Sequence, residues 1–448
     1  MASLVEPRVL KGFRDFLPAA EIERRGLVER IEAVFRGFGF APIDTPALEY
    51  AEILLGKGGG ETEKQVYRFN DNGGRDVALR FDLTVPFARF VAEHRAELTF
   101  PFKRYHIAKV WRGENTQRGR YREFTQCDFD CIGSNSAAAD FEILLMMKEA
   151  LSAAGASGIT IRLNHRGLFN RFLQTIDAAS KSGEILRAVD KLAKIGRDEA
   201  LKLLPSELDR GRAELIAGYV EIKGSWDEIL DRMTEAAGGD NPDSQRLRTL
   251  RGFMLDLGIG DTFVIDPSIS RGLDYYTGIV FETFLDGMPS IGSVCSGGRY
   301  DRLSGLYSKD GLSGVGSSIG LDRLLAALEA PGKTAKRETY AELAVICVDE
   351  GQGGICQRIA QRFRAAGIPT EVFFEAKKQG AQFAQAEKKG TRWALIPSAG
   401  ASAKEDGAGG PVRLRDLGER CTGAELSVDA AVDFFKKLKN ETGTREAY

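Results

Sequence analysis

Apolar residues along the first 166 positions follow two spacings, one typical of helices and one typical of strands. Helical spacing occurs over 20–38, 84–94 and 136–155. Strand patterns cover 40–46, where Pro46 ends the strand, and 76–83, 100–112, 120–133 and 159–165. Only the short polar segment ENTQRG separates 100–112 from 120–133, so we expect these two strands to form a long antiparallel hairpin.

From about residue 167 to residue 257 the pattern changes to charged helices with leucine at helical spacing, which predicts a helical insertion. Strand patterns resume at 262–268, 279–285 and 290–298, and a helix over 321–330 closes the block. The next ten residues, 331–340, are poor in apolar side chains and predict a linker. Strand and helix patterns alternate after it, which predicts a separate parallel α/β domain over 341–448.

Composition narrows the class of protein. The 448 residues carry 62 Lys and Arg against 64 Asp and Glu, so any nucleic-acid contact must come from a local patch. The six cysteines form no CxxC pair and there are three histidines, so we expect reduced thiols and neither zinc nor a disulfide framework. Because the chain has no 18-residue apolar run and no secretory pattern, we expect a cytoplasmic protein without a membrane segment.

Two glycine-rich segments resemble nucleotide-binding loops but depart from them. GKGGGET at 56–62 lacks the Gly-Lys-Ser/Thr ending of a phosphate-binding loop. GVGSSIG at 314–320 is one residue away from the GxGxxG pattern of dinucleotide-binding folds. We therefore interpret both as turns.

The predicted hairpin concentrates positive charge. Seven basic residues stand against the single acid Glu114: Lys103, Arg104, Lys109, Arg112, Arg118, Arg120 and Arg122. This excess suits a polyphosphate or a nucleic acid, although a solvated basic strand is the alternative. Alternation along 120–133 places one mixed set on a single face: Arg120, Arg122, Phe124, Gln126, Asp128 and Asp130. Such a face can stack a base, bind phosphate and hold a small cationic ligand.

Three further segments carry candidate chemistry. Asp82 ends a strand just before Thr84, where either residue could simply cap a helix. The turn RGLDYY holds Arg271, Tyr275 and Tyr276, although tyrosines at such turns commonly serve packing. Arg323 falls in the first turn of the helix after 314–320, where it could reach an anion near the helix N-terminus or lie at the surface.

Taken in order, these segments resemble the three signature motifs of class II aminoacyl-tRNA synthetases. The helix 20–38 with the strand ending in Pro46 resembles motif 1, which builds the dimer interface in that family. WRGE…RGRYREF resembles motif 2 and GVGSSIGLDR resembles motif 3. Within the class, KGFRDFLP, LRFDLTVP, RGLDYYTGIVFE and CSGGRYD resemble histidyl-tRNA synthetases, from residue 11 to about residue 330.

The resemblance implies an α+β fold with a class II antiparallel-sheet catalytic domain, a helical insertion and a small α/β anticodon-binding domain. The implied bounds are 1–166 and 258–330, 167–257 and 341–448, with 331–340 as the linker. The implied activity uses ATP with Mg²⁺ to convert L-histidine to its adenylate and then charges tRNA(His). A homodimer, no tightly bound cofactor and no zinc are also implied.

The same resemblance assigns roles to residues of this sequence. The implied histidine-binding residues are Asp82, Leu83, Thr84, Arg112, Gln126, Asp130, Arg271, Tyr275 and Tyr276. The implied ATP-binding residues are Arg112, Glu114, Arg120, Phe124 and Arg323. Arg112 and Arg271 would be catalytic, because a carboxylate attacking the α-phosphate needs cations fixed around that phosphate. A carboxylate and a phenol that match both imidazole nitrogens can discriminate by about 10⁴–10⁵, which makes separate editing unnecessary.

Two points bear on this resemblance. Positions 82 and 130 carry Asp where many bacterial members have Glu, and 115–130 looks more like eukaryotic-type members. The main alternative is the synthetase-like regulatory subunit of ATP phosphoribosyltransferase. Such subunits typically lack the anticodon domain and lose residues of the RGLDYY turn, whereas this chain retains Arg271 and about 110 residues after the linker.

Overall fold

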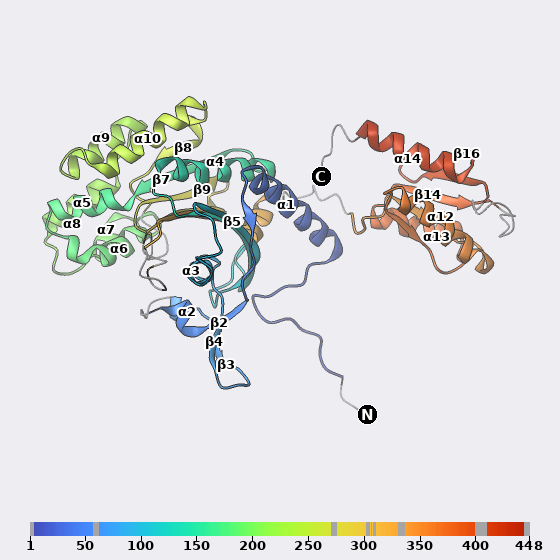
Figure 1. Cartoon of the computed structure of the whole chain (residues 1–448), viewed down its shortest axis with the longest axis horizontal. Coiled ribbons are helices and arrows are strands. Elements are labelled where there is room, and N and C mark those ends of the chain that lie inside the picture. Colours follow the sequence, from blue (N-terminus) through green and yellow to red (C-terminus); the bar gives the residue numbers. More distant parts are fainter. Residues whose placement is uncertain are drawn as a thin grey trace. The chain divides into compact units, whose positions relative to one another are not determined.

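The computed structural model describes residues 4–56, 62–269, 276–301, 305, 307, 311–329, 337–398 and 410–442. Two compact units make up the chain (Figure 1). The first contains Met1–Arg14 and Arg30–Glu329, and the second contains Asp15–Glu29 and Ala330–Tyr448.

An eight-stranded sheet forms the centre of the first unit. Its strands lie in the order β1 (Ala41–Pro42), β5 (Phe102–Trp111), β6 (Glu123–Ile132), β11 (Gly314–Gly320), β10 (Cys295–Tyr300), β9 (Ile279–Leu285), β7 (Ile159–His165) and β8 (Phe263–Ile265). Neighbours are antiparallel except at the two edges, where β1–β5 and β7–β8 are parallel. The hairpin β5–β6 pairs over its full length, from Phe102 opposite Ile132 to Trp111 opposite Glu123, which confirms the predicted hairpin.

Helices cover one face of this sheet. Phe35 of α1 (Pro18–Gly37) packs its ring against Tyr105 and Phe129, with centroids 5.6 and 4.8 Å away. The helices α4 (Ala137–Ala153) and α11 (Leu321–Leu328) also pack on this face. A buried ion pair of 2.5 Å between Arg299 and Asp140 joins β10 to α4. The odd-numbered side chains of β6 therefore form the core, as their alternation predicts.

The other face carries α3 (Thr84–Glu93), which lies on the inner side of the curved sheet in Figure 1. Next to it, a small sheet of β2 (Leu48–Tyr50), β4 (Asp76–Leu79) and β3 (Arg68–Asn70) packs with α2 (Ala51–Leu55). The strand predicted to end at Pro46 is shorter than expected, since β1 ends at Pro42, and the chain after Pro46 continues as β2 in a different sheet. Pro42 and Pro46 lack the N–H that a continuous ladder would need.

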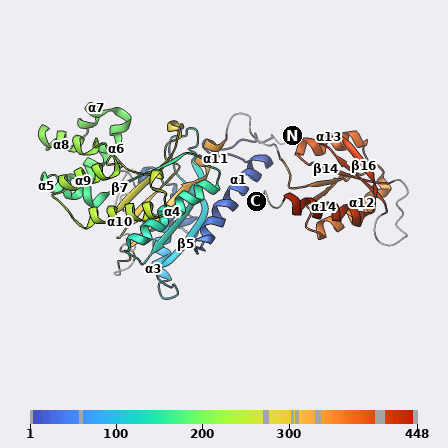
Figure 2. The ribbon, with the colours of Figure 1, turned by 90° about the horizontal axis from the view of Figure 1, so that it is seen from above.

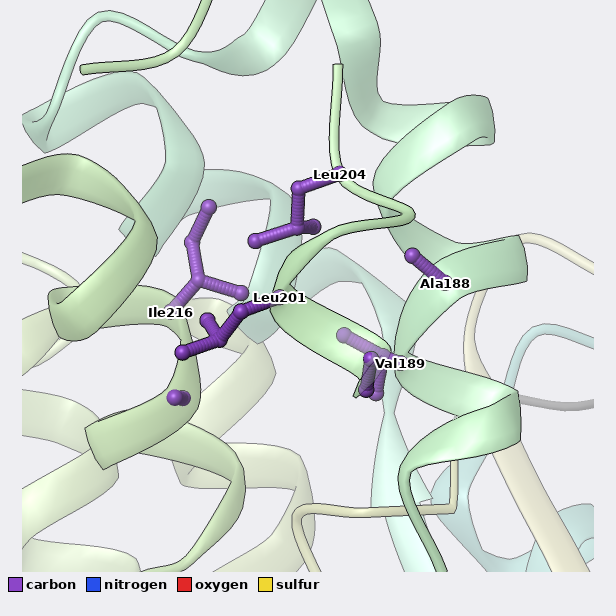
Figure 3. Close-up of a pocket in the computed structure, with 7 residues that line it drawn as sticks. Ala188, Val189, Leu201, Leu204 and Ile216 are labelled. Carbon is purple, nitrogen blue, oxygen red and sulfur yellow. The ribbon is translucent and has the colours of Figure 1, made fainter. Parts of the chain in front are cut away.

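Six helices follow β7, in the segment predicted to be a helical insertion. They are α5 (Arg166–Thr175), α6 (Ser182–Ile195), α7 (Arg197–Leu201), α8 (Arg210–Val220), α9 (Trp226–Ala236) and α10 (Pro242–Asp256). Capping boxes begin α9 at Ser225 and α10 at Asn241. Figure 3 shows an apolar pocket between α6, α7 and α8 whose volume of about 10 Å³ is too small for a ligand.

The second unit contains a five-stranded sheet in the order β13 (Thr370–Val372), β12 (Leu343–Val345), β14 (Trp393–Pro397), β15 (Val412–Asp416) and β16 (Cys421–Leu426). Its helices are α12 (Gly353–Ala365), α13 (Gln379–Lys389) and α14 (Val428–Thr442). In Figure 2, α12 and α14 lie on one side of the strands and α13 lies on the other. The prediction of a parallel α/β domain holds for β13, β12 and β14, but the hairpin β15–β16 makes the sheet mixed.

Candidate active site

The open face of the large sheet is built from residues that stand directly opposite each other on neighbouring strands. One row across the sheet consists of Arg104, Asp130, Gly316 and Gly298, on β5, β6, β11 and β10. The next row consists of His106, Asp128, Ser318 and Ser296 on the same four strands. Directly opposed residues share a face, so the two carboxylates and their partners all lie on the side that α3 covers.

Asp130 is held from two sides. One carboxylate oxygen, Oδ2, lies 2.6 Å from a guanidinium nitrogen of Arg104, and the other, Oδ1, accepts a 2.7 Å hydrogen bond from the Tyr300 hydroxyl. Room for this carboxylate comes from Gly316, where an added Cβ would lie 1.9 Å from Oδ1. Burial raises the pKa of Asp130, while Arg104 and the Tyr300 hydroxyl act in the opposite direction.

The segment 82–84 enters the same face at the beginning of α3. A carboxylate oxygen of Asp82 accepts a 3.1 Å hydrogen bond from the Val85 amide, which satisfies one free N–H of the first helical turn. Burial raises the pKa of Asp82 to about 6, partly opposed by Arg112 and Arg104. The Leu83 carbonyl accepts a hydrogen bond from Arg104, and Thr84 is buried. The capping role that the sequence left open is therefore real for Asp82.

Farther along the hairpin, the face becomes cationic and aromatic. Arg112 donates a 2.8 Å hydrogen bond to the Phe81 carbonyl, and its guanidinium carbon lies 5.2 Å from the centre of the Phe124 ring. Glu114 lies 3.7 Å from both Arg112 and Arg120, so one carboxylate links the two guanidiniums. Gln126 donates a 2.9 Å hydrogen bond to Ser318 on β11.

Arg323 approaches this cationic end from the first turn of α11. Burial lowers the pKa of Arg323 to about 10, and the positive charge of Arg120 and Arg112 acts in the same direction. Glu114 opposes this shift, so all four side chains share one electrostatic environment. Because Arg112 and Arg120 lie close enough to lower the pKa of Arg323, the three guanidiniums together indicate a site for a polyanion.

Arg14, in the N-terminal segment KGFRD, makes contacts next to this group of guanidiniums. Arg14 forms an ion pair with Asp322, whose other oxygen accepts a 2.7 Å hydrogen bond from the Thr125 amide. The Arg14 guanidinium also lies 3.9 Å from the centre of the Tyr121 ring. A first-turn acid of α11 thus connects the N-terminal segment with the β5–β6 hairpin.

Two predicted site residues, Arg271 and Tyr275, lie outside the described residues. The chain on both sides of them is held by residues at the junction of β7 and α5. The Asn164 side-chain amide donates to the carbonyls of Pro267 and Ile269, at 3.0 and 2.9 Å. Arg166 donates a 2.9 Å hydrogen bond to the carbonyl of Tyr276, whose ring lies against Gly298.

The structure corrects the interpretation of the basic hairpin. Arg104, counted there as part of a phosphate-binding surface, is fully buried in the Asp130 ion pair. Lys103 pairs with Glu142, and Lys109 pairs with Glu123. The free positive charge of the hairpin is therefore smaller than the sequence suggested, and it is concentrated near the loop.

Sequence reasoning counted Arg104 only as one of the basic residues of the hairpin, and it assigned no role to Tyr300, Arg14 or Asp322. Tyr300 lies within CSGGRYD and Arg14 within KGFRDFLP, so the resemblance marked their segments without marking the residues. The signal for Arg104 was its position on the same alternating face of the hairpin as the predicted ligands.

The described residues contain neither a metal-binding group nor a helix suited to a membrane. No group of three or more His, Cys, Asp or Glu among them is arranged to hold a metal ion. None of the helices in the described part of the chain has the length and apolar character that a membrane crossing requires.

Comparison with known proteins identifies this arrangement. The family model for histidyl-tRNA synthetase matches residues 12–324, and the model for an anticodon binding domain matches residues 342–438. The chain belongs to the histidyl-tRNA synthetase family. It is 53% identical to the histidine–tRNA ligase of Treponema denticola, over 98% of this chain and 100% of that protein. It is 48% identical to the histidine–tRNA ligase of Rhodopirellula baltica, over 90% of this chain and 92% of that protein.

Solved structures agree with the class II synthetase fold. The crystal structure of histidyl-tRNA synthetase from Nostoc sp. PCC 7120 superimposes with a TM-score of 0.83 at 32% identity, covering 97% of this chain and all of that one. An ATP phosphoribosyltransferase regulatory subunit/histidyl-tRNA synthetase from Bacillus halodurans superimposes with a TM-score of 0.72 at 22% identity, covering 86% of this chain and 97% of that one. The second similarity concerns the fold alone.

Proposed function

We propose that this chain is a histidine–tRNA ligase, which forms histidyl-adenylate and pyrophosphate from L-histidine and ATP and then transfers histidine to tRNA(His). One observation carries the proposal. Two buried carboxylates, Asp82 and Asp130, lie next to a group of three guanidiniums, Arg112, Arg120 and Arg323, because the charge of Arg112 acts on both Asp82 and Arg323. The first set suits the cationic groups of an amino acid, and the second suits a nucleoside triphosphate.

At the carboxylate end, Asp130 and Tyr276 bind the imidazole, with Tyr275 beside them. The ion pair with Arg104 and the hydrogen bond from Tyr300 orient the Asp130 carboxylate, which keeps lone pairs for a ring N–H. Asp82, Thr84 and Gln126 bind the α-ammonium and carboxylate groups, with the Leu83 backbone between them. The buried Asp82 carboxylate is suited to an ammonium, because a bound cation compensates its desolvation.

At the guanidinium end, ATP binds as its Mg²⁺ complex, with the adenine stacked on Phe124. Arg112 holds the α-phosphate and the histidine carboxylate, while Glu114 and Arg120 contact the nucleotide. Arg323 holds the far phosphates from the opposite side. Arginine suits these positions because it stays charged and offers paired N–H donors.

Arg271 carries the second catalytic role, stabilising the charge that develops at the α-phosphorus during attack. The residues that flank it, Ile269 and Tyr276, accept hydrogen bonds from Asn164 of β7 and Arg166 of α5. Positioned cations are the main catalytic requirement of phosphoryl chemistry, because the protein has little covalent work to do.

The chain is organised into domains and pairs with a second copy. We propose that 1–166 and 258–330 form the catalytic domain, 167–257 the insertion, 331–340 the linker and 341–448 the anticodon-binding domain. The helix and strand of motif 1 would form the interface of a homodimer in the cytoplasm. Light scattering of the purified protein tests the dimer, since a mass near 49.0 kDa would contradict it.

Amino-acid-dependent pyrophosphate exchange tests the activity. Exchange with histidine alone among the twenty amino acids supports the ligase, and charging of tRNA(His) completes it. The regulatory-subunit alternative predicts no exchange with any amino acid. It is not favoured, because the chain has an anticodon binding domain and its curated relatives are histidine–tRNA ligases over nearly their whole length.

A further inference from the structure

Arg104 is a charged residue to which the proposed function gives no role. Arg104 lies on β5 with its side chain completely buried, directly opposite Asp130 on β6. A buried cation is costly unless its surroundings compensate it. Its guanidinium carbon lies 4.2 Å from the centre of the Phe87 ring, and one nitrogen is shared between Asp130 Oδ2 and the Leu83 carbonyl. The nitrogens Nε and Nη1 find no hydrogen-bond acceptor within the described part of the chain.

Arg104 is a buried cation among three buried carboxylates. Asp82, Asp128 and Asp130 are each at most 2% exposed, and the charge of Arg104 acts on all three. Burial raises the pKa of Asp128 to about 7, and the neighbouring Asp130 and Asp82 act in the same direction. Without Arg104, the half-buried Arg112 would still act on Asp82 and the buried Arg80 on Asp128, whereas Asp130 would lose its ion pair.

We infer that Arg104 is a positioning residue for histidine recognition: its guanidinium orients the Asp130 carboxylate and keeps it ionised, so that Asp130 can accept a hydrogen bond from the imidazole ring. The inference rests on the proposed function and deepens it, because it names the group that makes Asp130 selective. Arg104 acts through Asp130, and it touches neither the nucleotide nor the reacting atoms. Its location on the Asp130 row separates it from the guanidinium end of the site.

The other groups around Asp130 fix the expected pH dependence. Tyr300 donates to it from β10, and Tyr276 lies beside Tyr300. Asp128 on β6 and Asp82 before α3 add negative charge. His106 stands opposite Asp128, and burial lowers its pKa to about 4, so it stays neutral above that value. Arg104 therefore supplies the positive charge that opposes protonation of Asp130 from within this row.

The test replaces Arg104 in the full-length chain and measures pyrophosphate exchange with histidine and with ATP as the varied substrates. Arg104→Met keeps the length of the side chain and removes its charge. We expect the KM for histidine at pH 7 to rise about 10- to 100-fold, the range for loss of a charged hydrogen bond, with the KM for ATP within about threefold of the original. The fold-increase in the KM for histidine should become smaller as pH rises from 6 to 8.5, because Asp130 without its partner ionises only at higher pH.

A double-variant cycle separates this role from a purely structural one. In an Asp130→Asn background, adding Arg104→Met should change the KM for histidine by less than about twofold, because the group through which Arg104 acts is already neutral. Arg104→Lys restores a positive charge and should recover most of the affinity and the original pH profile. If Arg104→Met alone fails to fold, the Asp130→Asn pair and Arg104→Lys still decide the matter, because the pair removes the carboxylate that Arg104 contacts and Arg104→Lys keeps a positive charge beside it.

The outcomes separate the two proposals. An equal loss from Arg104→Met in the presence and absence of the Asp130 carboxylate overturns the inference, as does an unchanged KM for histidine. A rise in the KM for ATP that matches the rise for histidine also overturns it, because it indicates general damage. If the unaltered chain shows no histidine-dependent exchange, the proposed function itself is wrong and this inference falls with it.

Discussion

Replacing Gly316 by alanine tests the geometry of the histidine end with the smallest change that the chain allows. Gly316 stands directly opposite Asp130, and a Cβ at this position would lie 1.9 Å from Oδ1 and 2.3 Å from Cγ of that residue. Because unbonded heavy atoms do not approach much closer than about 3 Å, the carboxylate must retreat by about 1 Å. It cannot retreat and keep both of its present partners.

The size of the effect follows from those partners. The displacement breaks or lengthens the 2.6 Å ion pair with Arg104 and the 2.7 Å hydrogen bond from Tyr300. Hydrogen bonds to charged groups contribute about 1.5–3 kcal/mol each, and overpacking a core costs about 1–3 kcal/mol. We therefore expect a loss of about 2–4 kcal/mol in histidine binding, which raises the KM for histidine about 30- to 900-fold.

The assay is pyrophosphate exchange with histidine and ATP varied separately, together with the thermal midpoint of unfolding. Gly320→Ala is the matched control, because it adds the same methyl group to the same strand with no atom nearer than 3.8 Å. Its thermal midpoint should stay near the original, whereas that of Gly316→Ala should fall. A Gly316→Ala protein with the original KM for histidine would refute the placement of Asp130 beneath the imidazole.

Three other predictions follow from the site and the domain plan. Arg271→Ala should leave histidine and ATP binding within about tenfold but slow adenylate formation by about 10²–10³ in rapid-quench experiments, whereas a normal single-turnover rate would remove Arg271 from catalysis. A chain ending near residue 335 should retain histidine-dependent exchange and charge tRNA poorly, and tRNA charging at the full rate would exclude the second unit from tRNA recognition. Asp128→Asn should gain stability relative to the original protein as pH rises from about 4 to about 7. Burial raises the pKa of Asp128 to about 7 in the folded chain, so between about pH 4 and pH 7 the carboxyl group ionises in the unfolded chain but stays protonated in the folded one. The original protein therefore loses stability as pH rises through that window. Thermal midpoints measured across that range test this, and a constant difference would contradict it.

The fold and the site were predictable from the sequence wherever one strand or helix carried the signal. Period-two alternation along β6 placed Phe124, Gln126 and Asp130 on one face and the core residues on the other, and the structure agrees. The hairpin could be predicted because its two strands are adjacent in the sequence. The roles of Arg112 and Arg323 came from the resemblance, while alternation alone left a solvated strand as an equal alternative.

Contacts between segments that are distant in the sequence could not be predicted. Arg104 has the same local pattern as a solvent-exposed base, and its burial results from α3 covering that face. Gly316 was interpreted as part of a turn, since the register that sets it opposite Asp130 is not visible in either segment alone. The hairpin β15–β16 was missed because β16 is mostly exposed and carries little apolar pattern.

The bond between Arg14 and Asp322 has a consequence for how the chain is made. These residues are separated by 308 positions, so Arg14 leaves the ribosome near the beginning of synthesis and Asp322 leaves it long afterwards. Domains commonly fold as they leave the ribosome, and contacts between distant positions form late because a long loop must close first. The nucleotide end of the site therefore cannot be completed until the first unit is almost entirely synthesised. A nascent chain arrested before residue 322 would keep its N-terminal segment unattached and its nucleotide site open.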